Sequence, residues 1–465
     1  MGSFYVENFG CRATQADGAA IERQLTGRGL SRAGTASEAE LVVLNTCTVT
    51  SSADQDARAT IRRIHRANPG ARIVVTGCYA QRAPEEIAAL EGVSLVVGNS
   101  HKHRLAEIAA TSGFVPLASL VTPSAAGATP SAAAGASGGH HAPVVVENIV
   151  AHAELLAAPV FDSDNEKTRP NLKVQDGCNN RCSFCVIPSV RGRSRSLPLG
   201  EVLANVDQLV ANGYQELVLS GINLGRWGRD LWAAPELNNA VGHLRFVDLL
   251  RAILERTGVP LLRISSVEPM DWSDELIALA AASPRIAKHA HVPLQSASDR
   301  ILRRMHRRYR PWHYEDRIQR IHVAMPQAAI GADVMVGFPG ESEEDFEQTC
   351  AFIERLPFTY LHVFTYSSRP GTPSAQMPGQ LPVHQARERN RLLRELAARK
   401  KRSFQKQFIG KTLPALTLTQ VSNGRTEALT GNYQKLWLAG SLPANRMLTA
   451  RIHCIEGEAL VGEVE

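Results

Sequence analysis

Short apolar runs alternate with helical patterns along most of this chain, and that alternation limits the fold more than any other feature. The pattern fills residues 1–110 and returns, in at least six strand–helix units, over residues 170–370. Successive strand–helix units place parallel strands side by side and helices on the faces of the sheet. We therefore expect an α/β protein with an N-terminal parallel-sheet α/β domain and a central (βα) partial barrel.

The expected strands are the buried apolar runs. In the first region they are residues 4–9, 41–44, 72–76 and 94–97. In the second they are residues 171–175, 216–220, 261–266, 287–292, 330–336 and 360–366.

Changes in composition divide the chain further. Residues 123–141 are nearly all Ala, Ser, Gly, Thr and Pro without periodicity, so they cannot bury enough surface to fold. Beyond residue 411, short strands separated by turn residues predict a small all-β domain. The expected parts are 1–110 (α/β domain), 111–160 (flexible Ala/Ser/Gly/Pro linker), 161–380 (partial barrel), 381–410 (basic helix) and 411–465 (small C-terminal all-β domain).

Three cysteines each follow a different strand of the first region. Cys11, Cys47 and Cys78 lie just past the carboxyl ends of their strands. Such ends share one edge of a parallel sheet, so the three thiols could meet although they are far apart in sequence. Any one of them alone is better explained as a packing cysteine, but the repeated position favours a shared metal cluster.

A second set of cysteines follows the first strand of the second region. Cys178, Cys182 and Cys185 have the spacing C-x3-C-x2-C, and no fourth cysteine lies nearby. A short loop can turn three sulfurs toward one metal centre, and three ligands leave a coordination position open for chemistry. The alternatives are a degenerate zinc knuckle and three buried thiols.

Polar or glycine-rich residues end the other strands of the second region, where they would face the cysteine loop. Gly337 and Gly340 would let the backbone approach a ligand closely. The segments are Ser220–Gly221–Ile222–Asn223, Glu268–Pro269, Pro293–Leu294–Gln295–Ser296 and Gly337–Phe338–Pro339–Gly340–Glu341.

Composition excludes several classes of protein. No signal peptide is visible, and no apolar run approaches the roughly 20 residues that span a membrane. Eight cysteines without secretory features indicate reduced thiols or metal ligands rather than disulfides. We expect a cytoplasmic protein without a membrane partner.

Positive charge gathers in one segment. Residues 379–408 contain nine Lys or Arg and two Glu, an excess larger than the net charge of +6 of the whole chain. This helix, with residues 191–195 and 303–308, is expected to meet phosphates of a nucleic acid. The alternative for residues 303–310 is a solvated helix face.

These motifs together resemble the methylthiotransferase family of radical S-adenosylmethionine (SAM) enzymes over almost the whole chain except the linker. The resemblance is carried by Gly10–Cys11, Asn45–Thr46–Cys47–Thr48–Val49–Thr50, Gly77–Cys78, Gln175–Asp176–Gly177 with the cysteine loop, Pro293–Ser296 and Val336–Glu341.

The resemblance implies cofactors and site residues. Cys178, Cys182 and Cys185 would hold a 4Fe–4S cluster that binds and reductively cleaves SAM, and Cys11, Cys47 and Cys78 would hold a second 4Fe–4S cluster that carries sulfur. The C-terminal domain would be a TRAM-type RNA-binding module. An electron donor such as flavodoxin or ferredoxin and a sulfur source are implied as partners. Contacts to SAM are expected from Ser220, Gly221, Asn223, Glu268, Gln295, Gly337, Gly340 and Glu341.

The resemblance also implies a substrate. The Asn-Thr-Cys-Thr-Val-Thr form is similar to the branch that methylthiolates C2 of N6-threonylcarbamoyladenosine beside the anticodon of tRNA, so the anticodon stem-loop is the expected partner. The alternatives are isopentenyladenosine in tRNA, an aspartate of a ribosomal protein, and a non-catalytic zinc-containing RNA-binding protein. Position 14 is Thr where the family usually has Asn, and we expect this departure to touch no cysteine.

Overall fold

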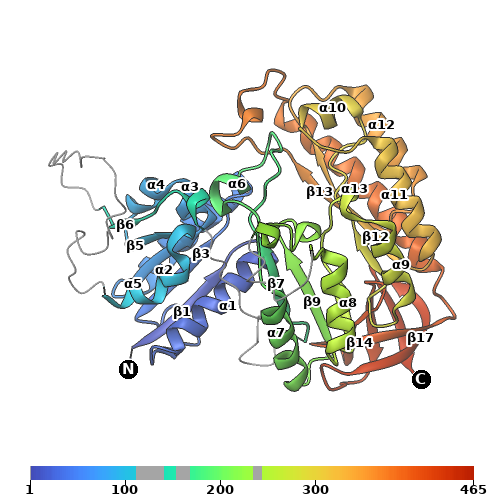
Figure 1. Cartoon of the computed structure of the whole chain (residues 1–465), viewed down its shortest axis with the longest axis horizontal. Coiled ribbons are helices and arrows are strands. Elements are labelled where there is room, and N and C mark those ends of the chain that lie inside the picture. Colours follow the sequence, from blue (N-terminus) through green and yellow to red (C-terminus); the bar gives the residue numbers. More distant parts are fainter. Residues whose placement is uncertain (1, 112–140, 153–167, 234–242) are drawn as a thin grey trace. The chain divides into compact units, whose positions relative to one another are not determined.

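The computed structural model describes residues 2–111, 141–152, 168–233 and 243–465 (Figure 1). Two compact units divide the chain. The first comprises Met1–Leu156 and, from farther along, Ser189–Arg191. The second comprises Ala157–Pro188 and Gly192–Glu465.

The first unit is built on a six-stranded parallel sheet in the order β2-β1-β3-β4-β5-β6. Continuous apolar runs form its central strands because both of their faces are covered. Helices α1 and α5 pack on one face, and helices α2 and α4 pack on the other. The elements are β1 (Ser3–Asn8), α1 (Arg12–Thr26), β2 (Ser31–Arg32), β3 (Leu41–Thr46), α2 (Ser51–Ala67), β4 (Arg72–Gly77), α3 (Cys78–Arg82), α4 (Pro84–Ala88), β5 (Val93–Gly98), α5 (Leu105–Thr111) and β6 (Val144–Val145).

Strand β6 corrects part of the expected linker. The expected linker spans residues 111–160, but Val144 and Val145 pair with β5 and extend the sheet. Ala142 is buried in the core of this unit. Residues 112–140 and 153–160 of the expected linker lie outside the described residues.

Within its described residues, the second unit contains six parallel strands in chain order, and they form the expected partial barrel. Isolated parallel bridges, Leu262 to Ile286 and Ser266 to His291, connect the sheet β10-β9-β7-β8 to the sheet β11-β12-β13. Only the short β8 runs antiparallel within the described part of these sheets. The strands are β7 (Asn171–Asp176), β8 (Arg195–Ser196), β9 (Glu216–Gly221), β10 (Leu261–Ile264), β11 (His289–His291), β12 (Ala329–Val336) and β13 (Tyr360–Thr365).

Helices between these strands cover the outside of the partial barrel, as α7, α8 and α11 do in Figure 1. Their first residues follow ordinary capping chemistry; the Ser342 side chain, for example, accepts from the backbone N–H of Asp345 at the start of α12. These helices are α7 (Leu199–Ala211), α8 (Phe246–Arg256), α9 (Asp274–Ala282), α10 (Asp299–Arg304), α11 (Pro311–Ala324) and α12 (Glu343–Arg355). The short α6 (Ile187–Arg191) ends with three residues of the first unit.

The basic segment is one helix, α13 (Val383–Lys406), and it leads into a closed five-stranded barrel. Phe404 and Phe408 share a core with the barrel residues Leu436 and Leu460 and with Ala329 of β12, so the small barrel packs against the partial barrel. Its strands are β14 (Thr412–Ser422), β15 (Arg425–Thr430), β16 (Lys435–Ala439), β17 (Met447–Glu456) and β18 (Ala459–Val464). Within the described residues, none of the helices is long and apolar enough to cross a lipid bilayer.

A buried ion pair closes the amino-terminal end of the partial barrel. Arg263 of β10 lies 2.7 Å from Glu216 of β9, and both side chains are almost fully buried. The guanidinium also donates to the carbonyl of Thr430 and lies over the ring of Tyr433, both from the small barrel. The carboxyl ends of the strands therefore remain for the functional site.

Candidate metal centres

The first three cysteines gather at one edge of the six-stranded sheet. Cys11 precedes α1, Cys47 follows β3 and Cys78 begins α3, and the strands before them, β1, β3 and β4, are neighbours. A Cβ added at Gly10 would lie 2.7 Å from Cβ of Cys47, so the turn before Cys11 approaches that cysteine directly. The positions predicted from the sequence are thus brought together.

Polar side chains surround this cysteine set. The amide nitrogen of Asn99 lies 3.6 Å from Sγ of Cys78, and the hydroxyl of Thr14 lies 3.5 Å from Sγ of Cys11. The expectation that Thr14 touches no cysteine is therefore wrong. Its place in the first turn of α1, three residues after Cys11, turns the hydroxyl back toward the thiol.

Two buried cations lie beside the same set. Lys102 and Arg191 share one buried carboxylate, Asp17, at 2.9 Å and 3.1 Å. The expectation that Arg191 meets phosphates is wrong, because only 2% of its side chain is exposed. The charge of Arg191 acts to lower the pKa of Cys47, so it favours the thiolate form of that cysteine.

Burial keeps the thiol of Cys47 protonated when it carries no metal, because it raises the pKa of that thiol. It raises the pKa of Cys47 to about 11, and the neighbouring Cys78 and Cys11 add to that rise. A metal cluster reverses the balance because its positive iron ions stabilise the thiolate form.

The second cysteine set lies on the loop after β7. Cys178, Cys182 and Cys185 are each half-buried, and Cys182 is close enough to raise the pKa of both other cysteines. Burial raises the pKa of Cys185 to about 12 and also raises the pKa of Cys178. Gly177 makes the turn possible: its φ is +70°, and an added Cβ would lie 2.0 Å from the carbonyl of Arg193.

Hydrogen-bond donors also reach the sulfurs of this loop. Asn223, at the end of β9, donates to Sγ of Cys178 at 3.5 Å, and Arg307 donates to Sγ of Cys182 at 3.3 Å. Arg307 also pairs with Glu268 and is 5% exposed, so the expectation that it meets phosphates is wrong. Donors of this kind tune the potential of an iron–sulfur cluster.

Two of the expected SAM-contacting residues have buried polar atoms without a partner. Oγ of Ser220 and Oδ1 of Asn223 make no hydrogen bond within the described structure. A buried polar atom without a partner costs free energy, so the site is suited to a polar ligand at the end of β9. Gln295 has a positive φ of 65°, a conformation that non-glycine residues adopt rarely and often at functional sites.

The turn from Gly337 to Glu341 is held by protein groups. A Cβ on Gly337 would lie 2.6 Å from Cβ of Ala386 in α13, and a Cβ on Gly340 would lie 3.0 Å from the guanidinium of Arg304. The carboxylate of Glu341 accepts from the N–H of Gly337 and from Arg389, each at 2.7 Å. These contacts explain the glycines without a ligand, and contacts from Gly337, Gly340 and Glu341 to SAM stay predictions.

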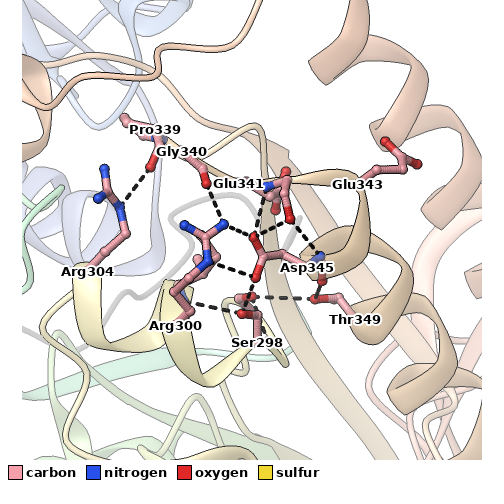
Figure 2. Close-up of polar contacts among 12 residues, drawn as sticks. Ser298, Arg300, Arg304, Pro339, Gly340, Glu341, Glu343, Asp345 and Thr349 are labelled. Atoms are coloured by element: carbon pink, nitrogen blue, oxygen red, sulfur yellow. Dashed lines mark hydrogen bonds and ion pairs between the residues drawn. The ribbon is translucent and has the colours of Figure 1, made fainter.

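Asp345 organises the polar contacts below this turn (Figure 2). It accepts from Oγ of Ser298 at 2.5 Å and from Arg300, which also donates to the carbonyl of Gly340 at 2.7 Å. Burial acts to raise the pKa of Asp345, but hydrogen bonds from Arg300 and Ser298 outweigh it, so the pKa is lowered. The ionised carboxylate thereby ties α10 to the start of α12.

Matches to known families fall on the two cysteine-bearing regions. A family described as "Uncharacterized protein family UPF0004" matches residues 3–98, and the radical SAM superfamily matches residues 172–353. A threonylcarbamoyladenosine tRNA methylthiotransferase from Aquifex aeolicus is 36% identical over 92% of this chain and 94% of its own length. The corresponding protein from Bacillus subtilis is 35% identical over 95% and 91%.

The chain belongs to the radical SAM methylthiotransferase family. A member from Saccharopolyspora erythraea, named tRNA-2-methylthio-N(6)-dimethylallyladenosine synthase, is 33% identical over 89% of this chain and 78% of its own length. Among solved structures, the radical SAM methyltransferase TsrM from Kitasatospora setae has a TM-score of 0.56 and covers 80% of this chain and 76% of its own. Its 17% identity supports the fold alone.

The donor set of this family member fits iron–sulfur clusters better than a single ion. Within the described residues, no group of three or more His, Cys, Asp or Glu is placed to hold one metal ion. A cluster binds each thiolate to a different iron, so its ligands need not converge on one point. Cluster ligation therefore agrees with the three-cysteine sets, whereas a closed zinc site would need four converging ligands.

Proposed function

We propose that this methylthiotransferase acts on tRNA and converts N6-threonylcarbamoyladenosine beside the anticodon to its 2-methylthio form. The observation that carries the proposal is the agreement of relatives with that name over more than nine-tenths of this chain and of their own lengths. Two cysteine sets at the carboxyl ends of parallel strands support it, because the reaction needs both a radical source and a sulfur carrier.

The loop cysteines would hold the cluster that binds SAM. Cys178, Cys182 and Cys185 ligate it in this proposal, and the unpartnered polar atoms of Ser220 and Asn223 orient the bound SAM. When bound, the 4Fe–4S cluster and SAM supply the radical chemistry that attacks an unactivated C–H bond. Arg307 and Asn223 stabilise the thiolates by donating hydrogen bonds to them.

The other cysteine set would hold the second 4Fe–4S cluster. Cys11, Cys47 and Cys78 ligate it, and Asn99 donates to one of their sulfurs. Lys102 and Arg191 place positive charge beside the set, which favours the thiolate forms. An electron donor such as flavodoxin or ferredoxin and a source of sulfur complete the partners that the reaction requires.

The tRNA would be held by the basic helix and the small barrel. Helix α13 carries the largest concentration of positive charge, and the five-stranded barrel has the size of a TRAM module. A base beside the anticodon is already single-stranded, so it can be turned into a protein site at low cost.

Mass spectrometry of tRNA nucleosides tests the proposal. Deleting the gene should remove 2-methylthio-N6-threonylcarbamoyladenosine and leave threonylcarbamoyladenosine in its place. Loss of the methylthio form of isopentenyladenosine alone would assign the chain to the second candidate, which the 33% identical relative favours. No change in either nucleoside would contradict a tRNA substrate. The remaining alternatives would then be methylthiolation of a ribosomal-protein aspartate and a non-catalytic RNA-binding role.

Two variants test whether one cysteine set serves SAM cleavage and the other serves sulfur transfer. Cys182→Ala should abolish formation of 5′-deoxyadenosine from SAM, because it removes a ligand of the cleaving cluster. Cys47→Ala should retain that formation and lose the methylthiolated product. Full product formation by the Cys47 variant would contradict the assignment of the second cluster.

A further inference from the structure

A pocket of about 690 Å³ lies along β13, the last strand of the partial barrel, and its lining residues include no cysteine of either set. Its walls are the edge strand β13, one face of helix α13 and two turns of the small barrel. The volume is in the range of pockets that hold a small organic ligand. The lining residues used below are Phe364, His362, Arg394, Lys401, Arg402 and Glu458.

One wall of the pocket is cationic. Arg394 precedes Lys401 by seven residues and Arg402 by eight, about two helical turns, so the three cations lie on the side of α13 that lines the pocket. Ala397 and Ala398 separate them and leave room above the backbone. Both arginines are exposed, and no ion pair of either is found in the described part of the chain.

The pocket contains one acidic side chain on its rim. Glu458 pairs with Lys401 at 2.8 Å and is 86% exposed. Lys401 is therefore already partly neutralised, and the two arginines carry the charge available to a ligand. Guanidinium groups suit phosphate oxygens because their donors form a planar fork.

Aromatic side chains of β13 also line the pocket. Phe364 is 45% exposed, so its ring is accessible to a ligand. Its ring lies 6.5 Å from the ring of His362, whose side chain is also half-exposed. Exposed rings and exposed arginines in one pocket match the stacking platforms and charged grooves that bind single-stranded nucleic acid.

We infer that this pocket holds one nucleotide of the tRNA anticodon loop that flanks the modified base, with its phosphate on Arg394 and Arg402 and its base against Phe364. The inference rests on the proposed function, because it takes tRNA as the substrate. The pocket also joins the two elements with the strongest RNA-binding features, α13 and the small barrel, so one bound nucleotide would fix their register on the RNA.

Binding of an anticodon stem-loop RNA to the full-length protein tests the inference without requiring turnover. In fluorescence anisotropy, the double variant Arg394→Ala/Arg402→Ala should raise Kd at least about tenfold and lower the slope of log K against log salt by about two, one for each lost phosphate contact. Arg399→Ala/Lys406→Ala is the matched control, since it removes two cations of α13 outside this pocket. Equal effects of the two double variants would overturn the inference.

The aromatic wall gives a second, independent readout. Phe364→Ala should weaken binding about tenfold with no change in the salt slope, because stacking is lost and no charge is removed. Phe364→Trp should restore binding. A Phe364→Ala variant that binds as the unchanged protein does would contradict the stacking role.

The proposed function and the pocket can fail separately. Formation of 5′-deoxyadenosine without RNA should be unchanged in all these variants. If the gene deletion leaves tRNA nucleosides unaltered while the pocket variants still lose RNA affinity, the pocket stands and the substrate is wrong. If methylthiolation is confirmed while the pocket variants bind RNA normally, the pocket inference is wrong.

Discussion

The ion pair between Arg389 and Glu341 allows a test of how the basic helix α13 is held against the turn that follows β12. Arg389 of α13 lies 2.7 Å from Glu341, and the two side chains are 9% and 2% exposed. Arg389→Met would keep much of the aliphatic volume but leave the carboxylate with one remaining donor, the N–H of Gly337. Removing one partner of a buried pair costs about 3–5 kcal/mol. We expect about 3 kcal/mol at pH 8, because the Gly337 donor remains.

This loss should depend on pH in a defined direction. Burial already raises the pKa of Glu341, although Gly337 and Arg389 oppose the rise, and removing Arg389 raises that pKa further. An acid whose pKa is higher in the folded state loses stability as pH rises from its unfolded pKa to its folded pKa. The destabilisation should therefore be smaller at pH 5.5 than at pH 8, by up to about 1.4 kcal/mol for each pH unit between the folded-state pKa of Glu341 in the unchanged protein and the higher one in the variant.

Tryptophan fluorescence during urea unfolding reports the stability of the second structural unit, to which Arg389 and Glu341 belong. All five tryptophans, at positions 227, 232, 272, 312 and 437, belong to the second unit. The double variant Arg389→Met/Glu341→Gln should recover part of the loss, since no charge is left buried. Arg391→Met on the same helix is the control, because its partners Glu388 and Glu395 are exposed. The same loss at both pH values, or no recovery in the double variant, would refute the reasoning.

Three further outcomes are expected. Gly10→Ala should lower the iron content of the protein to about half, because the new Cβ would lie 2.7 Å from Cβ of Cys47. The control Gly29→Ala, at a similar positive φ with open space around it, should retain the full iron content. Iron and sulfide analysis measures both variants. In cluster-free protein at pH 8, iodoacetamide should modify the exposed Cys11 and Cys454 before Cys47 and Cys185. The pKa values of Cys47 and Cys185, about 11 and about 12, keep these two thiols protonated until the pH is raised. Peptide mass spectrometry gives the order of modification. Asp345→Ala should destabilise the second unit by about 2 kcal/mol at pH 7 and by less near pH 3, because the pKa of Asp345 is lowered in the folded state; the fluorescence assay above measures both values.

The strands and both cysteine sets could be predicted because their causes are local. Strands such as β3 and β9 are continuous apolar runs, and the structure extends the expected bounds by only one or two residues. Cysteine spacing and the strand before each cysteine are also visible in the sequence. The shared sheet edge then follows from parallel topology.

The surroundings of the cysteines could not be predicted in the same way. Arg191 was expected on an RNA-facing surface, yet its partner Asp17 lies 174 residues away. Arg307 was expected there too, but it pairs with Glu268 and donates to Cys182. A run of positive charge shows only that cations are present, and it takes the fold to show which of them meet a buried carboxylate or a sulfur. Asn99 and Lys102 carried no signal of their own in the sequence, and Asn223 was expected to contact SAM rather than to donate to the sulfur of Cys178.

The assignment of Ser189–Arg191 to the first unit affects how this enzyme can be divided. The chain leaves the first unit, forms the loop with Cys185, and returns within six residues to supply Arg191 to Asp17. A fragment ending at Leu156 would therefore lack one of the two cations on that carboxylate. Cutting the chain between residues 112 and 140 would leave β6 and Ser189–Arg191 of the first unit on the same fragment as the second unit. Exchange of the amino-terminal unit between relatives should succeed only when these three residues are exchanged with it.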